Sequence, residues 1–204
     1  IDLKQLPKTR TAIKLNVASP SLAFKFAALP NKGVGLAREE FIINNYIKIH
    51  PLALLRHREL NDSELSGQIT SAIRGFRDEE DYFLQKLSFG IAKIAAAFYP
   101  NEVIVRFSDF KSNEYYNLLG GKYFEPKEEN PMIGWRGASR YYSDTYKEAF
   151  GLECKAIRRV REQMGLRNVS VMIPFCRTPQ ELEKVLAVCS PMGWKENTTG
   201  CACT

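Results

Sequence analysis

Three arginines of this chain are placed where they could hold one small anion. Arg38 ends a short apolar run at 33–38, Arg106 ends a β-branched run that starts at Val103, and Arg136 lies in a glycine-containing loop. A guanidinium group presents a planar fork that matches the oxygens of a carboxylate or a phosphate in pairs. Arginines at successive strand ends can therefore converge on the same dianion. The sequence predicts a phosphate or carboxylate site.

Acidic residues adjoin the two strand-end arginines. Glu39, Glu40 and Asp109 could accept hydrogen bonds from the guanidinium groups and so orient them. For Glu39 and Glu40 the alternative is an interaction with the positive end of the helix that follows. The strand-end arginines could instead be surface residues, and Arg136 could stack on an aromatic ring.

The rest of the sequence shows no catalytic group. His50 and His57 lie in no motif, and no glycine-rich phosphate loop of the Walker type occurs. Cys154 falls on the apolar side of a predicted helix, where we expect a buried structural thiol. The cysteines near the end of the sequence lack the further ligands that a zinc site needs. We therefore assign no catalytic residue and no metal ligand.

Charge and hydropathy limit the classes of partner. The 204 residues carry a net charge of +6 and are 45% hydrophobic. Basic residues alternate with acids rather than forming a block, so we expect no nucleic-acid partner. No apolar run approaches the roughly 18 to 20 residues that span a bilayer, so we expect no membrane segment and a cytoplasmic location. The first residues lack an initiator methionine, so we expect the interior of a longer chain.

Strand-like and helical patterns alternate along the chain. Each strand-like run is followed by a helical pattern, and the longest helical pattern, at 63–98, has a break at 75–81. Such alternation predicts parallel strands with helical crossovers, in a doubly wound sheet or a TIM-type barrel. We favour an α/β fold of partial (β/α)8 type, with about the first four βα units and a helical insertion. The strands are expected at 11–18, 33–37, 102–107 and 168–175.

One domain and an irregular tail are expected. The domain covers 1–188 and includes a long loop between the third strand and a helix at 144–164. The stretch at 189–204 has no apolar period, so we expect an aberrant, disordered tail.

Three segments resemble, in chain order, blocks of the C-terminal barrel of the phosphoenolpyruvate (PEP)-utilising enzymes. The segment 108–115 is similar to the PEP synthase branch of that family, and the resemblance runs from about residue 1 to residue 188. The sequence departs from the family at Glu39, where related enzymes often have Thr or Leu. The three segments are 33–41 (GVGLAREEF), 103–109 (VIVRFSD) and 130–137 (NPMIGWRG).

The resemblance implies a fragment of a pyruvate, water dikinase. Such an enzyme makes PEP, AMP and phosphate from ATP, pyruvate and water by way of a phosphohistidine on another domain of the same protein. In the family, arginines that match Arg38 and Arg106 bind the substrate, and Arg136 matches an arginine near the same site. The family's Mg²⁺ ligands and acid cysteine match nothing in this chain, so we expect the fragment alone to be inactive, and the intact enzyme to be a homo-oligomer. The alternatives are a non-catalytic module that binds anions or another protein, and a nucleic-acid binder.

Overall fold

Five short parallel strands form one sheet, and their order in the sheet follows their order in the chain. The computed structural model describes residues 9–190 and 201–203. The sequence places the first four strands correctly, although all but the second are shorter than the ranges expected for them. The strands are β1 (Leu15–Val17), β2 (Val34–Arg38), β3 (Val103–Arg106), β4 (Val169–Ile173) and β5 (Cys201–Cys203).

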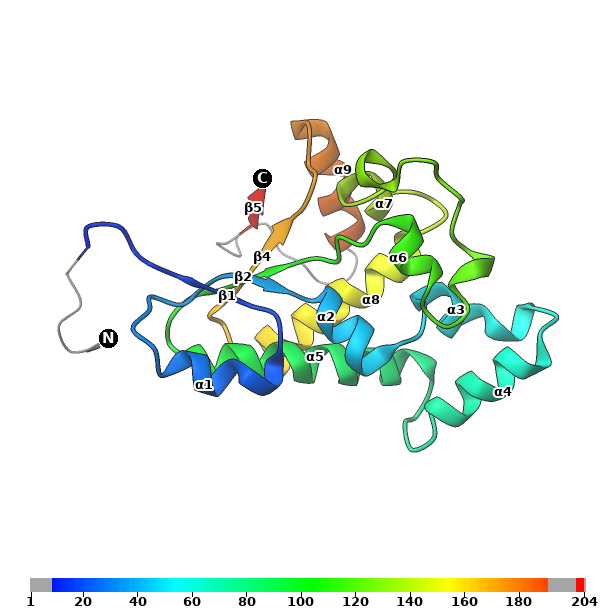
Figure 1. Ribbon diagram of the computed structural model, residues 1–204, viewed down its shortest axis with the longest axis horizontal. Coiled ribbons are helices and arrows are strands. Elements are labelled where there is room, and N and C mark those ends of the chain that lie inside the picture. The colour runs from blue at the N-terminus through cyan, green and yellow to red at the C-terminus, as the bar shows by residue number, and fades with distance from the viewer. Residues whose placement is uncertain (1–8, 191–200, 204) are drawn as a thin grey trace.

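One principal helix covers each crossover between neighbouring strands. These helices pack in the order of the strands that they connect: α1 contacts α5, α5 contacts α8, and α8 contacts α9 (Figure 1). A ring of helices outside consecutive parallel strands is the arrangement of a βα barrel, here present in part and not closed by the described residues. The α/β class is confirmed. The four helices are α1 (Ala23–Ala27), α5 (Glu79–Phe98), α8 (Lys147–Arg158), which continues as η7 (Arg159–Gln163), and α9 (Pro179–Cys189).

Shorter helices fill two excursions at the carboxyl ends of β2 and β3. The stretch between β3 and α8, expected as a loop, contains several single-turn helices that lack an apolar period long enough to detect. The first excursion contains α2 (Glu40–Ile42), η3 (Ile43–Ile47), α3 (Pro51–Arg56), η4 (His57–Glu59) and α4 (Ser63–Ala72). The second contains α6 (Ser112–Tyr116), η5 (Gly121–Tyr123), η6 (Pro131–Ile133) and α7 (Ala138–Tyr141), and η2 (Pro20–Leu22) precedes α1.

Local capping explains where the long helices begin. Asp78 accepts a hydrogen bond from the backbone N–H of Asp81 at 2.7 Å, and acids fill the first turn of α5. Thr178 accepts from the N–H of Glu181, and Pro179 takes the first helical position of α9. The break expected at 75–81 is confirmed, because α4 ends at Ala72 and α5 begins after Asp78.

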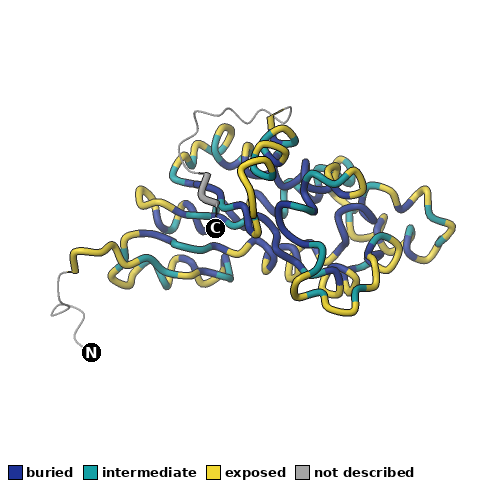
Figure 2. The backbone as a smooth tube through the Cα atoms, turned by 90° about the horizontal axis from the view of Figure 1, so that it is seen from above, coloured by how far each residue is buried: buried dark blue, intermediate teal, exposed yellow. Residues whose placement is uncertain are grey.

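The core lies between the sheet and the ring of helices. Figure 2 shows the buried backbone running through the middle of the molecule, with exposed segments at its periphery. Val103 and Val105 are buried while Ile104 and Arg106 are half-buried, which is the two-residue alternation of a strand. Cys154 is confirmed as a buried thiol, and its Sγ lies 3.1 Å from that of Cys189.

The stretch at 189–204, expected as a disordered tail, is described only in part. Cys189 is the last residue of α9, and Cys201–Cys203 forms β5, which pairs with β4 so that Val171 is opposite Cys201. The remainder of that stretch lies outside the described residues.

Candidate functional site

Arg38 and Arg106 occupy equivalent positions at the ends of neighbouring strands. They are the last residues of β2 and β3, and they lie opposite each other in the parallel register. Because parallel strands present their carboxyl ends at one edge of the sheet, the two side chains reach the same cavity. This cavity has a volume of about 290 Å³, and Arg38, Arg106 and Arg136 all line it. The structure thus brings all three predicted arginines together.

Arg136 reaches the cavity because its loop docks on the end of β4. The N–H of Ala138 donates to the carbonyl of Pro174 at 3.0 Å. At Gly137 a Cβ would lie 2.4 Å from that carbonyl oxygen, and its φ of +62° suits glycine. The Arg136 guanidinium lies 4.6 Å from the ring centroid of Phe175. Arg136 therefore lines the cavity and at the same time lies over an aromatic ring.

Two of the three predicted acids orient the arginines. Arg106 pairs with Glu40 Oε1 at 2.6 Å and with Asp109 Oδ2 at 3.0 Å. Asp109 also accepts from Arg136 Nε at 2.8 Å, so one carboxylate joins two guanidinium groups. Burial raises the pKa of Glu40, although Arg106 opposes this shift. Glu39, in contrast, contacts none of the three arginines.

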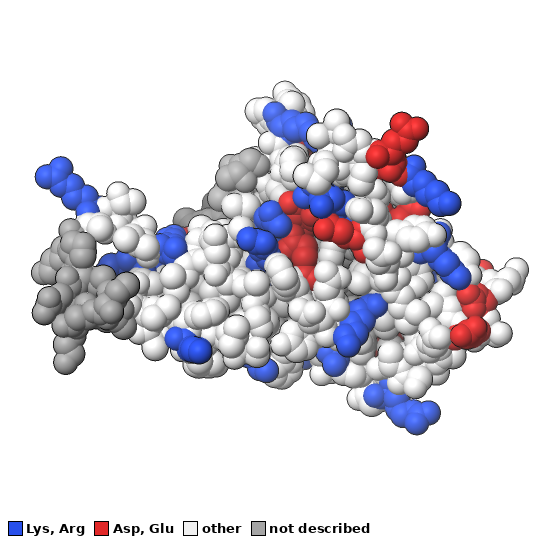
Figure 3. Space-filling model, viewed as in Figure 1, with Lys and Arg blue, Asp and Glu red and all other residues white. Residues whose placement is uncertain are grey.

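Acids pair with Arg106 and Arg136, so the uncompensated positive charge of the site is that of the exposed Arg38. Within the described ranges, Arg38 takes part in no ion pair with an acid; it is exposed, and its guanidinium lies 5.9 Å from the ring centroid of Phe41. Figure 3 shows acidic side chains gathered near the middle of one face, above α2, with basic side chains beside them. An anion that enters this cavity meets Arg38 without displacing an existing carboxylate.

A buried polar network that the sequence did not reveal supports the loop of Arg136. Arg140 is fully buried and forms two hydrogen bonds with Glu125, at 2.6 and 2.7 Å. Glu125 also accepts from Nε2 of His50 at 2.9 Å, while Nδ1 of His50 accepts the N–H of Leu52 at 3.2 Å. These residues are far apart in the chain and belong to no local motif, so no pattern in the sequence indicates their contact.

The network fixes both charge and geometry. Burial disfavours the charged form of Glu125, but hydrogen bonds from Arg140 and His50 outweigh it and lower its pKa. Burial lowers the pKa of His50, so its neutral form is favoured. Arg140 also donates to the carbonyl of Trp135, at 3.2 and 3.3 Å. Because Trp135 directly precedes Arg136, this contact holds the backbone from which Arg136 projects.

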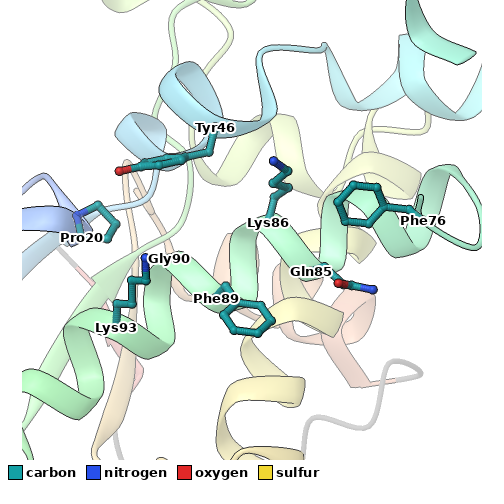
Figure 4. A pocket seen from close by; sticks show the side chains of 8 residues that line it. All are labelled: Pro20, Tyr46, Phe76, Gln85, Lys86, Phe89, Gly90 and Lys93. Carbon is teal, nitrogen blue, oxygen red and sulfur yellow. The ribbon is translucent and has the colours of Figure 1, made fainter. Parts of the chain in front are cut away.

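A second cavity lies away from the strand ends, on the outer side of α5 (Figure 4). It is lined by Tyr46 of η3 and by Lys86, Phe89 and Lys93 of α5. It has the same volume, about 290 Å³, but no arginine lines it. The predicted anion site is therefore the cavity at the strand ends, which we call the arginine pocket.

The residues of the arginine pocket do not fit a divalent metal. Magnesium prefers carboxylate oxygens that are free to coordinate it. Arg106 instead engages Glu40 Oε1 and Asp109 Oδ2, and Arg136 engages Asp109 Oδ1. Within residues 9–190 and 201–203, no three or more His, Cys, Asp or Glu side chains are grouped so that they could hold a metal ion.

Comparison with known proteins gives a consistent set of relatives. The family model described as PEP-utilising enzyme, PEP-binding domain, matches residues 2–202, which extends past the expected end of the resemblance at 188. The chain is 58% identical to a phosphoenolpyruvate synthase of Synechocystis sp. (strain ATCC 27184 / PCC 6803 / Kazusa), over 98% of this chain and 24% of that protein. It is 51% identical to that of Aquifex aeolicus (strain VF5), over 98% of this chain and 29% of that protein. It is 49% identical to that of Escherichia coli (strain K12), over 97% of this chain and 25% of that protein. The chain thus spans about a quarter of the length of these relatives, from 24% to 29%.

Proposed function

This chain belongs to the PEP-binding domain family of the PEP-utilising enzymes, and we propose that it forms the substrate-binding part of a phosphoenolpyruvate synthase. The observation that carries this proposal is the convergence of Arg38, Arg106 and Arg136 on one cavity. A PEP molecule carries a phosphoryl group and a carboxylate, and each of these presents oxygens to a guanidinium fork.

The arrangement of charges supports a division of labour among the arginines. Arg106 is held on two sides by Glu40 and Asp109, so its direction is fixed before a ligand arrives. Arg38 has no acid partner among the described residues and supplies uncompensated positive charge. We assign Arg38 and Arg106 to the anionic groups of PEP or pyruvate, and Arg136 to the rim of the same site. This assignment rests on the geometry and the charge of the site.

The reaction of the whole protein is part of the proposal. A synthase of this kind would convert ATP, pyruvate and water to AMP, PEP and phosphate, with a phosphohistidine domain as the partner of this site. In the proposed whole reaction, Mg²⁺ would neutralise the charge of the phosphoryl group that is transferred. No residue of the arginine pocket is assigned to it, and no step proposed for this pocket passes through it. In the part of the chain that the structure describes, no helix is long and apolar enough to cross a bilayer.

Binding of PEP to the 204-residue chain tests the proposal. Isothermal titration with PEP should give a saturable signal, and pyruvate and inorganic phosphate should compete for it. Arg106→Lys should weaken PEP binding by roughly 10- to 100-fold, because a point charge replaces a fork whose hydrogen bonds to charged groups are worth about 1.5–3 kcal/mol.

Arg56→Lys is the matched control. Arg56 lies on the surface and pairs with Glu148, outside the arginine pocket. The variant should bind PEP as the unaltered chain does. Equal PEP affinity in Arg106→Lys and the unaltered chain would refute the assignment of this pocket.

A further inference from the structure

Two carboxyl groups are buried together beneath the arginine pocket. Glu39 is 1% exposed and Glu153, on α8, is fully buried. Both accept the same backbone N–H, that of Ser108: Glu39 Oε1 at 2.9 Å and Glu153 Oε2 at 3.1 Å. Because both carboxyl groups bind this one nitrogen, they are close neighbours. A hydrogen bond between two carboxyl groups needs a proton on one of them.

No cation compensates this pair. Within the described ranges, neither Glu39 nor Glu153 forms an ion pair with a lysine, arginine or histidine. Two unpaired negative charges at a buried site are costly, and such pairs keep one proton between them. The pair therefore fits a single negative charge better than two.

The hydrogen bonds favour Glu39 as the partner that carries the proton. Glu153 accepts both the N–H and the hydroxyl of Ser108, the latter at 2.6 Å, so its oxygens are well supplied with donors. Glu39 Oε2 is buried and has no donor among the described residues. A proton on this oxygen turns it into a donor toward Glu153. An otherwise unsatisfied buried atom is then satisfied.

We propose that Glu39 and Glu153 share one proton, and that this carboxyl pair holds the segment that orients the arginines of the pocket. Ser108, which both acids bind, directly precedes Asp109. Asp109 in turn pairs with Arg106 and Arg136. Loss of the shared proton adds a second negative charge next to this segment, and it weakens the binding of anions in the pocket.

The groups that face the pair favour the shared proton. Burial is the main cause that raises the pKa of Glu39 well above its ordinary value, and the charge of Glu153 adds to it. The neighbouring hydroxyls of Tyr115 and Tyr141 bond to Ser108 Oγ and to its carbonyl, each at 2.7 Å, and Tyr146 Oη donates to Tyr115 Oη. The charge of the adjacent Glu40 raises the pKa of Glu39 further. The positive charge of Arg140 instead favours the ionised form of Glu153 and opposes the rise of its pKa.

The direction of the pH dependence follows from the raised pKa. Glu39 binds its proton more tightly in the folded chain than in the unfolded chain. The stability that this proton contributes is fully present below the unfolded pKa and is lost as pH rises through the folded pKa. Affinity for an anion in the pocket should fall over the same pH range, by up to about tenfold per pH unit for one linked proton.

Infrared spectroscopy of the 204-residue chain tests the proton directly. At neutral pH the spectrum should contain the carbonyl stretch of a protonated carboxyl group, and this band should shift when the chain is made with isotope-labelled glutamate. The band should be absent in Glu39→Gln, whose amide replaces the protonated carboxyl as a donor to Glu153. The absence of such a band from the unaltered chain would overturn the proposal without the need for any variant.

Oxalate titration tests the effect on the pocket, and this arm rests on the proposed function. Oxalate is a dicarboxylate that stays fully ionised near neutral pH, so its own titration does not interfere. Its affinity should fall with rising pH in the unaltered chain and in the control Glu148→Gln, a surface change on α8, but not in Glu39→Gln. The same pH dependence in Glu39→Gln would overturn the link to the pocket. If oxalate and PEP fail to bind at all, the proposed function fails, whereas the infrared band still decides whether the proton is shared.

Discussion

The arginine pocket depends on a few charged residues whose partners can be named. Arg106 has acid partners on two sides, and Asp109 joins it to Arg136, so a change at Asp109 alters two guanidinium groups at once. Arg38 differs because aromatic contact with Phe41, rather than an acid, is its nearest described interaction. At this scale the pocket is a set of oriented donors with one exposed positive charge.

Arg140 offers the clearest test of a single supporting residue. Arg140→Gln removes the partner of buried Glu125, and breaking a buried pair in this way costs about 3–5 kcal/mol. Urea denaturation should show this loss in the free energy of unfolding. The surface pair of Arg56 with Glu148 supplies the control, since Arg56→Gln should change the stability by less than about 1 kcal/mol.

Replacing both partners of the buried pair separates charge from packing. The double variant Arg140→Met with Glu125→Leu leaves no isolated charge and should recover much of the stability that Arg140→Gln loses. A double variant as unstable as Arg140→Gln would contradict this account, because it would assign the cost to lost shape rather than to an unpaired carboxylate.

At the scale of elements, the register of β2 and β3 brings Arg38 and Arg106 together, and one glycine brings Arg136 to them. Gly137→Ala places a Cβ against the Pro174 carbonyl at a backbone conformation that alanine resists. We expect destabilisation of about 1–3 kcal/mol, the usual range for a strained backbone position, together with weaker PEP binding.

A glycine in open space serves as the matched control. Gly67 lies in the middle of α4, and a Cβ there meets nothing within 4 Å. Gly67→Ala should therefore stabilise the chain, by about 0.5–1 kcal/mol, through helix propensity alone. Thermal unfolding of both variants should show a lower melting temperature for Gly137→Ala and a higher one for Gly67→Ala. Gly137→Ala with unchanged stability would show that the loop does not depend on this close approach.

Local patterns predict most of the elements that position the pocket. The strands that carry Arg38 and Arg106 are apolar and short, and helices follow them, so this alternation indicates parallel strands whose ends share one edge. The break before α5 and the start of α9 follow from capping residues in the same way.

Contacts between distant segments could not be predicted from local patterns. The Glu125–Arg140 pair lies in a stretch of single-turn helices without an apolar period, and its third member, His50, follows β2 rather than β3. The orientation of Glu39 was also hidden, because neighbouring acids at a helix start look alike in sequence. The register turns Glu40 toward Arg106 and Glu39 toward Ser108.

At the scale of the whole molecule, the described sheet has two outer strands. β1 and β5 each pair with one neighbour in residues 9–190 and 201–203. Unpaired strand edges and exposed apolar side chains favour association with other chains. We expect light scattering of the purified 204-residue chain to show dimers or larger species. A compact monomer that unfolds cooperatively would contradict this expectation.

The central claim, that the arginine pocket holds the anionic groups of PEP, is tested most directly by a crystal structure of this chain grown with PEP. The account predicts phosphoryl or carboxylate oxygens within about 3 Å of the guanidinium nitrogens of Arg38 and Arg106. PEP bound elsewhere, for example between Lys86 and Lys93 in the cavity outside α5, with the arginine pocket empty, would contradict it.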